Sequence, residues 1–152
     1  MAVGRGALKV QNITSAAYTY NVAVGYSAGE AVTTGTLNSI VGGVAAAALQ
    51  NGVRNTVMGY AALGSATSSD TCTTIGYAAG YQITTGSNNT ALGQDALRTG
   101  SPGGPATTDS NVIGLGNGNI SSFHCQVALT VSSDQRDKTD FVDLDLGLDF
   151  VK

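Results

Sequence analysis

The apolar and polar positions of this chain repeat every 17 residues. Within each repeat, a glycine follows an apolar side chain, and an alanine comes three positions after that glycine. The glycines of this series are Gly25, Gly42, Gly59, Gly76 and Gly93, with Gly4 and Gly114 flanking them at a spacing of 21. A fixed period indicates one structural unit that stacks on copies of itself along the chain.

The repeat starts with asparagine, which is followed by small or β-branched side chains. Aligned on the glycines, the units read NVAVGYSAGEAVTTGTL from 21, NSIVGGVAAAALQNGVR from 38, NTVMGYAALGSATSSDT from 55, CTTIGYAAGYQITTGSN from 72 and NTALGQDALRTGSPGGPATTD from 89, the last being longer by four. Such a unit is too short for a helical repeat of about 33 residues or a propeller blade of about 40. Its Thr, Val and Gly content also disfavours helix. Each unit is therefore predicted to form one coil of a parallel β-solenoid.

Two short strands are predicted in each coil. The first covers VAVG, SIVG, TVMG, TTIG and TALG, and the second lies in AVTTG (31–35) and YQITTG (81–86) and ends in a glycine turn. Coils stack about 4.8 Å apart, so that roughly six or seven of them would form a rod about 30 Å long. We therefore expect an all-β fold, a parallel β-solenoid or β-roll with 17-residue coils, over residues 1–131.

The recurrent polar and glycine positions are interpreted as a structural ladder. Asparagine side chains at a coil corner can bond the turn backbone and the next asparagine in the stack, and glycine either adopts a positive φ or admits a neighbouring backbone. The asparagines are Asn21, Asn38, Asn55 and Asn89, and Cys72 takes their place in one coil as a small buried thiol. Tyr26, Tyr60 and Tyr77 directly follow series glycines and form a partial aromatic stripe, for which packing or ligand binding are the two interpretations.

The composition indicates a narrow core. Glycine supplies 21 of the 152 residues, whereas the chain has three Phe and no Trp. A solenoid this thin buries little apolar area by itself, and the chain begins inside the motif without a capping element. We therefore expect a homotrimer in which each chain covers its neighbour. We also expect either that the first coil abuts another part of a larger assembly, or that the chain is a shortened piece of a longer protein.

Charge and sequence patterning exclude several classes of function. Residues 1–132 have no net charge, and residues 133–152 carry six Asp against Arg136, Lys138 and Lys152. No basic surface is predicted, so we expect no nucleic-acid partner. There is no apolar run of about 18 residues and no signal-peptide pattern, so we expect no membrane insertion.

No cofactor or metal site is expected from the sequence. His124 and Cys125 are too few to bind a metal and are interpreted as a buried strand pair. The stretch VIGLGNGN (112–119) lacks the spacing of a dinucleotide-binding loop, and its Gly114 is assigned to the glycine series. Threonine pairs at 33–34 and 84–85 resemble the threonine arrays of ice-binding solenoids, but the other coils lack them, so we expect no ice binding.

The end of the chain carries a different motif. The stretch SSDQRDKTDFVDLDLGLDFVK, residues 132–152, resembles the beginning of the self-cleaving intramolecular chaperone that ends many phage tail fibres and endosialidase-type tailspikes. The family motif Ser-Asp-x-Arg-x-Lys is matched by Ser133, Asp134, Arg136 and Lys138. The upstream repeats are similar to the shafts and heads of phage fibres and of trimeric bacterial adhesins. The two resemblances together cover nearly the whole chain.

This resemblance implies a chaperone that trimerises, assists folding of the shaft and is then released by self-cleavage. Ser133 would be the nucleophile and Lys138 its base, with the cut next to Ser133, before Asp134; a lysine can act as a base when burial lowers its pKa. The family's domain extends much further past its motif than Lys152 does here. We therefore expect an uncleaved chain with an inactive pair, and a truncated chaperone segment over residues 132–152.

The expected function is a structural and adhesive component of a phage tail fibre. The resemblance implies a homotrimeric β-roll that is assembled in the host cytoplasm, carried on the virion beside other tail proteins, and directed at a glycan or protein receptor on the host cell. Two alternatives stay open. One is the head of a trimeric bacterial adhesin, a class that needs a signal peptide and a membrane anchor. The other is a self-cleaving Ser-Lys chaperone-peptidase fragment.

Overall fold

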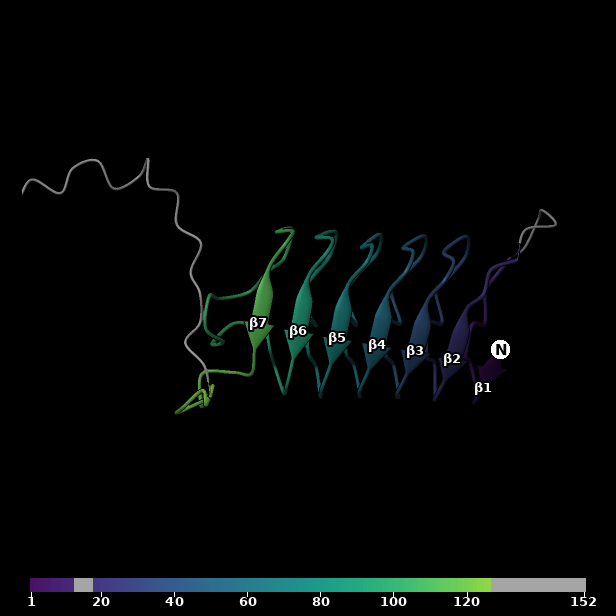
Figure 1. The fold of residues 1–152 in the computed structure, drawn as a ribbon. Coiled ribbons are helices and arrows are strands. Elements are labelled where there is room, and N and C mark those ends of the chain that lie inside the picture. The colour runs from purple at the N-terminus through teal and green to yellow at the C-terminus, as the bar shows by residue number, and fades with distance from the viewer. Residues whose placement is uncertain (13–17, 127–152) are drawn as a thin grey trace, which may run out of the picture. The chain divides into compact units, whose positions relative to one another are not determined.

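The computed structural model describes residues 1–12 and 18–126, which contain seven short parallel strands in one sheet and no helix (Figure 1). The strands are β1 (Ala2–Val3), β2 (Val22–Val24), β3 (Ser39–Val41), β4 (Thr56–Met58), β5 (Thr73–Ile75), β6 (Thr90–Leu92) and β7 (Ile113–Leu115). Their order in the sheet is their order along the chain. The predicted all-β solenoid with coils of 17 residues is confirmed.

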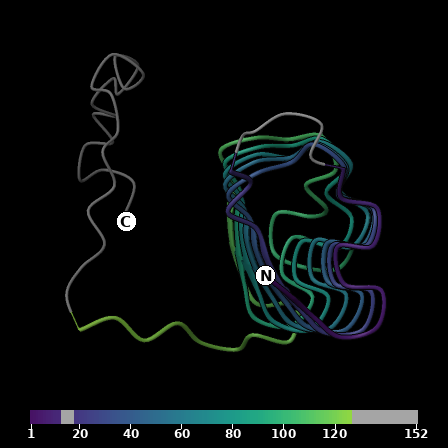
Figure 2. The same cartoon turned by 90° about the vertical axis from the view of Figure 1, so that its right-hand side faces the viewer.

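The strands pair in the register that the repeat predicts. Ala23 lies opposite Ile40, Ile40 opposite Val57, and so on at intervals of one repeat from β2 to β6. Viewed along the stack, the coils superpose as nested loops around a common interior (Figure 2). Equivalent residues of successive coils therefore form columns that run along the solenoid.

The second strand predicted in each coil is wrong. Residues 31–35 and 81–86 form turns and bends in which neighbouring coils are joined by separate hydrogen bonds. The N–H of Thr33 donates to the carbonyl of Gln50 at 2.8 Å, for example. Local turns explain this, because the N–H of Val32 donates to the carbonyl of Gly29 at 3.0 Å, the N–H of Ile83 donates to that of Gly80 at 3.0 Å, and both glycines are left-handed (φ 60° and 62°). Left-handed residues interrupt the extended conformation that a strand requires.

The register of the last coil differs from the prediction. Thr90 of β6 pairs with Ile113 of β7, 23 residues later, so this coil is longer by six residues rather than four. Gly114 is the buried centre of β7 and lies opposite Ala91, and Gly116 instead stands beside Gly93. The assignment of Gly114 to the glycine series is therefore wrong. A side chain at Gly114 would overlap Leu97, which fills that part of the interior.

The interior is narrow and is filled by a few small or medium side chains from each coil. They come from the strand centre and from the positions three, four and seven residues after the glycine. Large and small residues alternate among these positions: one coil uses Val57 with Leu63, and the next uses Thr74 with Gly80 and Ile83. The alanines three residues after the glycine are all buried, namely Ala28, Ala45, Ala62, Ala79 and Ala96. The core thus keeps a constant width.

The solenoid forms one compact unit, Met1–Ser121, and residues 122–126 are the described part of a second unit. His124 and Cys125 are exposed there, and residues 122–126 contain no strand. The buried strand pair predicted for them is therefore wrong, because β7 is the last strand within the described residues. The predicted domain boundary at 131/132 and the predicted self-cleavage residues Ser133, Asp134 and Lys138 lie outside the described part of the chain.

Candidate functional site

The asparagine column closes each coil and holds the next one. The Asn38 Nδ2 donates to the carbonyl of Gly52, at the end of the same coil, at 2.8 Å. Its Oδ1 accepts the backbone N–H of Asn55, in the next coil, at 3.0 Å. Asn21, Asn55 and Asn89 are buried and make corresponding bonds. Since these amides are committed to the backbone, the column is a structural element and offers no free group to a ligand.

Cys72 replaces asparagine in this column. Its thiol is buried, and Sγ lies 3.5 Å from the carbonyl oxygen of Gly86, where the other coils have an asparagine Nδ2. Burial raises the pKa of the Cys72 thiol, and the backbone N–H of Asn89, which faces the sulfur, opposes that rise. The thiol therefore stays protonated and makes only weak hydrogen bonds.

The glycine series meets both conditions expected of it. Gly25 and Gly76 have φ of 137° and 136°, which favours glycine. A methyl group added at Gly25 would lie 2.5 Å from the carbonyl oxygen of Gly42, its neighbour in the next coil. Gly42 and Gly59 also have positive φ and are equally close to the carbonyl oxygen of the next glycine, whereas a methyl group added at Gly93 (φ 101°) would lie 3.1 Å from the Cα of Gly116. The series marks where adjacent backbones approach too closely for a side chain.

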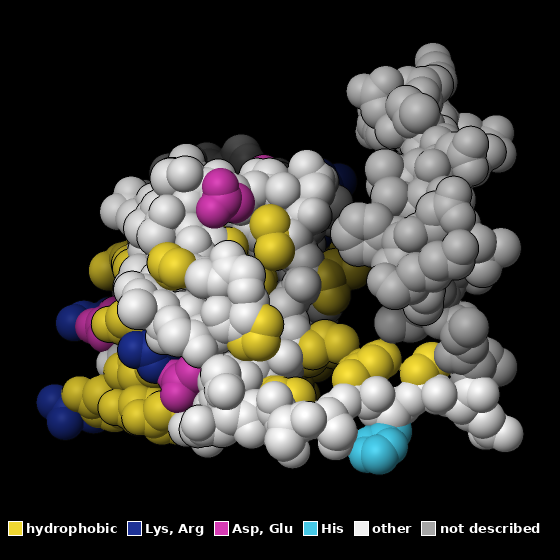
Figure 3. All heavy atoms as spheres, turned by 90° about the vertical axis from the view of Figure 1, so that its left-hand side faces the viewer, with side chains coloured by type: hydrophobic (Ala, Val, Ile, Leu, Met, Phe, Trp, Pro, Cys, Tyr) yellow, Lys and Arg dark blue, Asp and Glu magenta, His cyan; other side chains and the backbone are white. Residues whose placement is uncertain are grey.

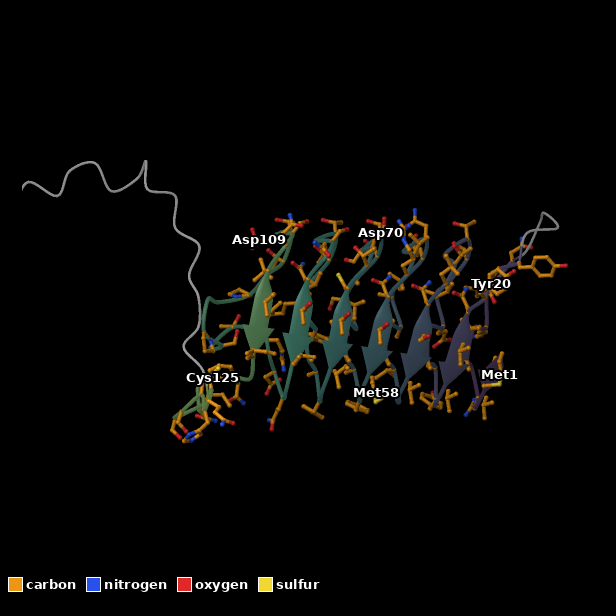
Figure 4. The ribbon with its side chains drawn as sticks, viewed as in Figure 1. Met1, Tyr20, Met58, Asp70, Asp109 and Cys125 are labelled. Carbon is orange, nitrogen blue, oxygen red and sulfur yellow. The ribbon has the colours of Figure 1, made fainter. Side chains whose placement is uncertain are left out.

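A second polar ladder lies on the coil edge opposite to Met58. The N–H of Val53 donates to Asp70 Oδ1 at 2.8 Å, the N–H of Asp70 to Ser87 Oγ at 3.0 Å, and the N–H of Ser87 to Ser110 Oγ at 2.9 Å. Figure 4 shows Asp70 at this edge. The sequence analysis missed the ladder, although its short polar side chains recur with the repeat. Its bonds give Asp70 a structural role.

The outward face of the sheet carries a continuous apolar column. It consists of the residue that precedes each glycine of the stack, and we call it the aliphatic column: Val3, Val24, Val41, Met58, Ile75, Leu92 and Leu115. Six of these seven side chains are exposed, from 36% for Val41 to 52% for Val3. Met58, at the carboxyl end of β4, marks the column in Figure 4. These side chains point away from the core, so packing in the interior does not explain why they are all apolar.

A hydroxyl column runs beside the aliphatic column on the same face. It contains Ser39, Thr56, Thr73 and Thr90, each two residues before a member of the aliphatic column. Val22 and Ile113 occupy its two ends. Successive strand residues point to opposite faces, so the two columns share the outer face while the strand centres fill the core. The outer face is thus half apolar and half polar, and it carries no charged side chain.

Exposed tyrosines stand at the corner next to the aliphatic column. Tyr26, Tyr60 and Tyr77 are more than half exposed, and the rings of Tyr60 and Tyr77 stack with centroids 5.6 Å apart at an interplanar angle of 13°. Gly43 interrupts the stripe, and a methyl group there would lie 3.3 Å from the Tyr60 ring. In the end view of Figure 3, hydrophobic side chains protrude along one edge of the solenoid. Stacking and close packing on glycine hold the rings in place.

Tyr81 extends this aromatic surface, a role that the sequence analysis missed. Its ring packs on Gly64, where an added methyl would lie 2.9 Å from the ring carbons. The Arg98 guanidinium lies 5.3 Å from the ring centroid and forms an ion pair with Asp95. The sequence contains a signal for this contact, because Tyr81 and Arg98 both stand five residues after a series glycine and so occupy the same position of the repeat. We call Tyr26, Tyr60, Tyr77 and Tyr81 the tyrosine face.

A shallow hollow of about 350 Å³ lies at the β1 end of the tyrosine face. Its lining includes Arg5, Lys9, Tyr26 and Glu30, and the Lys9 Nζ lies 3.1 Å from Glu30 Oε1. A hydrogen bond from Ser27 and then the contact with Lys9 lower the pKa of Glu30. The hollow therefore offers an aromatic wall beside both charged and neutral hydrogen-bonding groups.

The described part of the chain contains no grouping of metal ligands and no membrane-spanning helix. No three His, Cys, Asp or Glu side chains among residues 1–12 and 18–126 are grouped so that they could hold a metal ion. In the same residues no helix has the length and hydropathy needed to span a bilayer. Comparison of the chain with protein-family models, with curated proteins and with solved structures gave no match. The tyrosine face and the aliphatic column are therefore the candidate functional surfaces.

Proposed function

We propose that this chain is a structural and adhesive component of a phage tail fibre. In this proposal the solenoid forms a homotrimeric shaft or head, and its tyrosine face binds a receptor on the host surface. The observation that carries the proposal is the fixed arrangement of the exposed rings of Tyr60, Tyr77 and Tyr81 beside the half-buried Arg98. The motif from Ser133 to Lys138, with its resemblance to the tail-fibre chaperone, supports the proposal that the protein is part of a phage tail fibre.

The tyrosine face has the composition of a binding surface. Tyrosine and arginine dominate the residues that contribute most to binding at protein surfaces, because their large side chains combine apolar area with a polar group. The rings are already ordered by stacking and by contact with Gly43 and Gly64, so that little side-chain entropy is lost when a ligand binds. None of these side chains belongs to the core.

A surface glycan is the receptor that this arrangement favours. The exposed apolar area of the Tyr60 and Tyr77 rings suits the C–H groups of a sugar, and their hydroxyls, with Arg98, suit its hydroxyl groups. The hollow beside Tyr26 adds Arg5, Lys9 and Glu30 for hydrogen bonds. No chemical conversion of the ligand is proposed at this surface.

The test is binding to purified bacterial lipopolysaccharides and capsular polysaccharides, immobilised as a panel for biolayer interferometry. We expect the unaltered chain to bind a subset of the panel. The double variant Tyr60→Ala/Tyr77→Ala is expected to weaken that binding about tenfold or more, because a central aromatic side chain often contributes about 2 kcal/mol.

The matched control is Tyr18→Ala/Tyr20→Ala. These two tyrosines are exposed and their rings lie 5.6 Å apart, but they are not part of the tyrosine face. The control is expected to bind as the unaltered chain does. Absence of binding to every polysaccharide, or equal loss in both double variants, would contradict the proposed receptor surface.

A further inference from the structure

We propose that the aliphatic column is the surface through which copies of this chain associate, side by side, parallel and in register. The proposal rests on the homotrimer of the proposed function and identifies the residues that form its interface. The column contains seven apolar side chains, one on each strand, without a charged or polar interruption from Val3 to Leu115.

Parallel sheets in proteins are almost always covered on both faces. Here the inner face packs against the core through the strand centres, such as Ile40 and Val57. No segment within residues 1–12 and 18–121 covers the outer face at Met58 or Leu115, whose side chains are 50% and 44% exposed. The solenoid therefore presents one uncovered face of a parallel sheet, and its apolar half is the aliphatic column.

The area of the column fits the centre of an interface. Fully burying an aliphatic side chain removes roughly 60–120 Å² from water, so seven side chains at their observed exposure present roughly 200–350 Å². A stable interface takes about 800 Å² from each partner and has an apolar centre with a polar rim. The aliphatic column supplies such a centre, and the adjacent hydroxyl column supplies a rim on one side.

The spacing of the column identifies the partner as a second copy of this chain. One apolar side chain is presented per coil, at the strand spacing of about 4.8 Å. A partner that meets every one of them must have the same spacing along the same line, which another solenoid in register has. Because no column residue is charged, identical copies that meet there do not repel each other electrostatically.

Three-fold symmetry then fixes the orientation. If three solenoids share one axis parallel to their length, the symmetry places every residue at the same height as its equivalents. Met58 of one copy therefore meets Met58 of its neighbours, and Ile75 meets Ile75. A parallel arrangement also leaves the tyrosine face, at the corner beyond the column, at the outer margin of the interface.

The first test measures mass by light scattering after charges are placed in the column. We expect the unaltered chain at three times 15.2 kDa. The variant Met58→Asp/Ile75→Asp is expected at the mass of one chain, because burying four or more carboxylates together is unfavourable. The matched control, Ser68→Asp/Thr85→Asp, adds the same charges to the same two coils at other exposed positions and is expected to stay trimeric.

The second test detects the register and does not depend on a destabilising variant. In a Cys125→Ser background, Met58→Cys chains and Ile75→Cys chains of distinguishable mass are refolded together and oxidised. We expect disulfides between two copies of Cys at 58 and between two copies at 75, and none between 58 and 75. Mixed 58–75 pairs, or equal crosslinking of a Ser68→Cys control, would overturn the proposed register.

The outcomes separate this inference from the proposed function. A trimer that persists in Met58→Asp/Ile75→Asp overturns the aliphatic column as the interface and leaves the trimeric fibre intact. An unaltered chain that is monomeric at all concentrations contradicts the trimeric fibre and the interface together. Loss of polysaccharide binding alone bears on the tyrosine face and leaves the interface unaffected.

Discussion

At the scale of single residues, one asparagine per coil performs two tasks. The amide nitrogen of Asn38 closes its own coil at Gly52, and the oxygen holds the backbone of the next coil at Asn55. Both partners are backbone groups that would otherwise be buried without a hydrogen bond, which is costly. A side chain with a donor and an acceptor on the same carbon is required, and cysteine meets this requirement only weakly.

The asparagine column predicts that Cys72→Asn stabilises the protein. The new side chain can donate to the carbonyl of Gly86 and accept the N–H of Asn89, two groups that now face sulfur. We expect the free energy of unfolding, measured by urea titration, to rise by about 1–2 kcal/mol. The reverse change in the neighbouring coil, Asn55→Cys, is expected to lower it by a similar amount. If Cys72→Asn leaves the free energy of unfolding unchanged or lowers it, then hydrogen bonding at position 72 does not limit the stability of the asparagine column.

The glycine series predicts that the stability cost of a glycine-to-alanine substitution depends strongly on its position in the coil. Gly76→Ala would place a methyl group 2.6 Å from the carbonyl oxygen of Gly93 at a φ of 136°, so both strain and a backbone clash are expected. The loss of unfolding free energy should be roughly 3 kcal/mol or more. Gly100→Ala is the control, since Gly100 also has a positive φ but has nothing within 4 Å. It should cost about 1 kcal/mol. Equal losses in urea unfolding would contradict the close-approach explanation.

At the scale of the elements, the stack is built from strands of two or three residues that have no stability alone. The sequence predicted their positions well, because asparagine, glycine and the apolar residue between them fix the register of β2 to β6. It did not predict that the rest of the coil would be turns. Threonine and valine in 31–35 favour a strand, but the turn between left-handed Gly29 and Val32 overrides that preference.

The register at the longer coil could not be obtained from glycine spacing alone. Gly114 and Gly116 both fit a glycine series, and only packing distinguishes them: Leu97 occupies the space beside Gly114. Size compensation inside a coil links positions that are not adjacent in sequence, such as Ala91 and Leu97. A pattern of single positions does not contain that information.

The strand centres predict a stabilising change in β5. Thr74 is fully buried in the core, and its Oγ1 has no hydrogen-bond partner. Thr74→Val removes that unpaired hydroxyl at nearly constant volume, so the unfolding free energy should rise by about 1–2 kcal/mol. Val57→Thr, at the same position of β4, should lower it by a similar amount. Thermal and urea unfolding of both variants checks this, and a destabilised Thr74→Val would contradict the assigned burial.

At the scale of the whole molecule, the candidate surfaces were only partly accessible to sequence analysis. The stripe of Tyr26, Tyr60 and Tyr77 follows directly from the repeat. Tyr81 and Arg98 share one position of the repeat, but their contact with each other became evident only in three dimensions, because it depends on how the coil turns after each glycine. The aliphatic column was recognised in sequence as strand, and its exposure became evident once the opposite face of each strand was seen to fill the core.

The stacked structure predicts a difference in thiol reactivity. Cys125 is exposed, whereas Cys72 is buried and burial raises its pKa, so little thiolate is present at Cys72. In a titration with a disulfide reagent at pH 8, we expect one fast thiol per chain in the native protein and two after denaturation. The Cys125→Ser variant should show no fast thiol. A fast reaction in that variant would indicate that the solenoid opens readily at β5.

The constant period of the coils from β2 to β6 has a consequence for the length of the molecule. Removing residues 38–54 would join Leu37 to Asn55 and keep asparagine stacked on asparagine and glycine on glycine, since the excised segment is one full period. Duplicating the same segment would lengthen the particle by one layer in the same way. Gain or loss of whole periods in the gene thus offers a simple means of setting the length of the solenoid, without redesign of its cross-section.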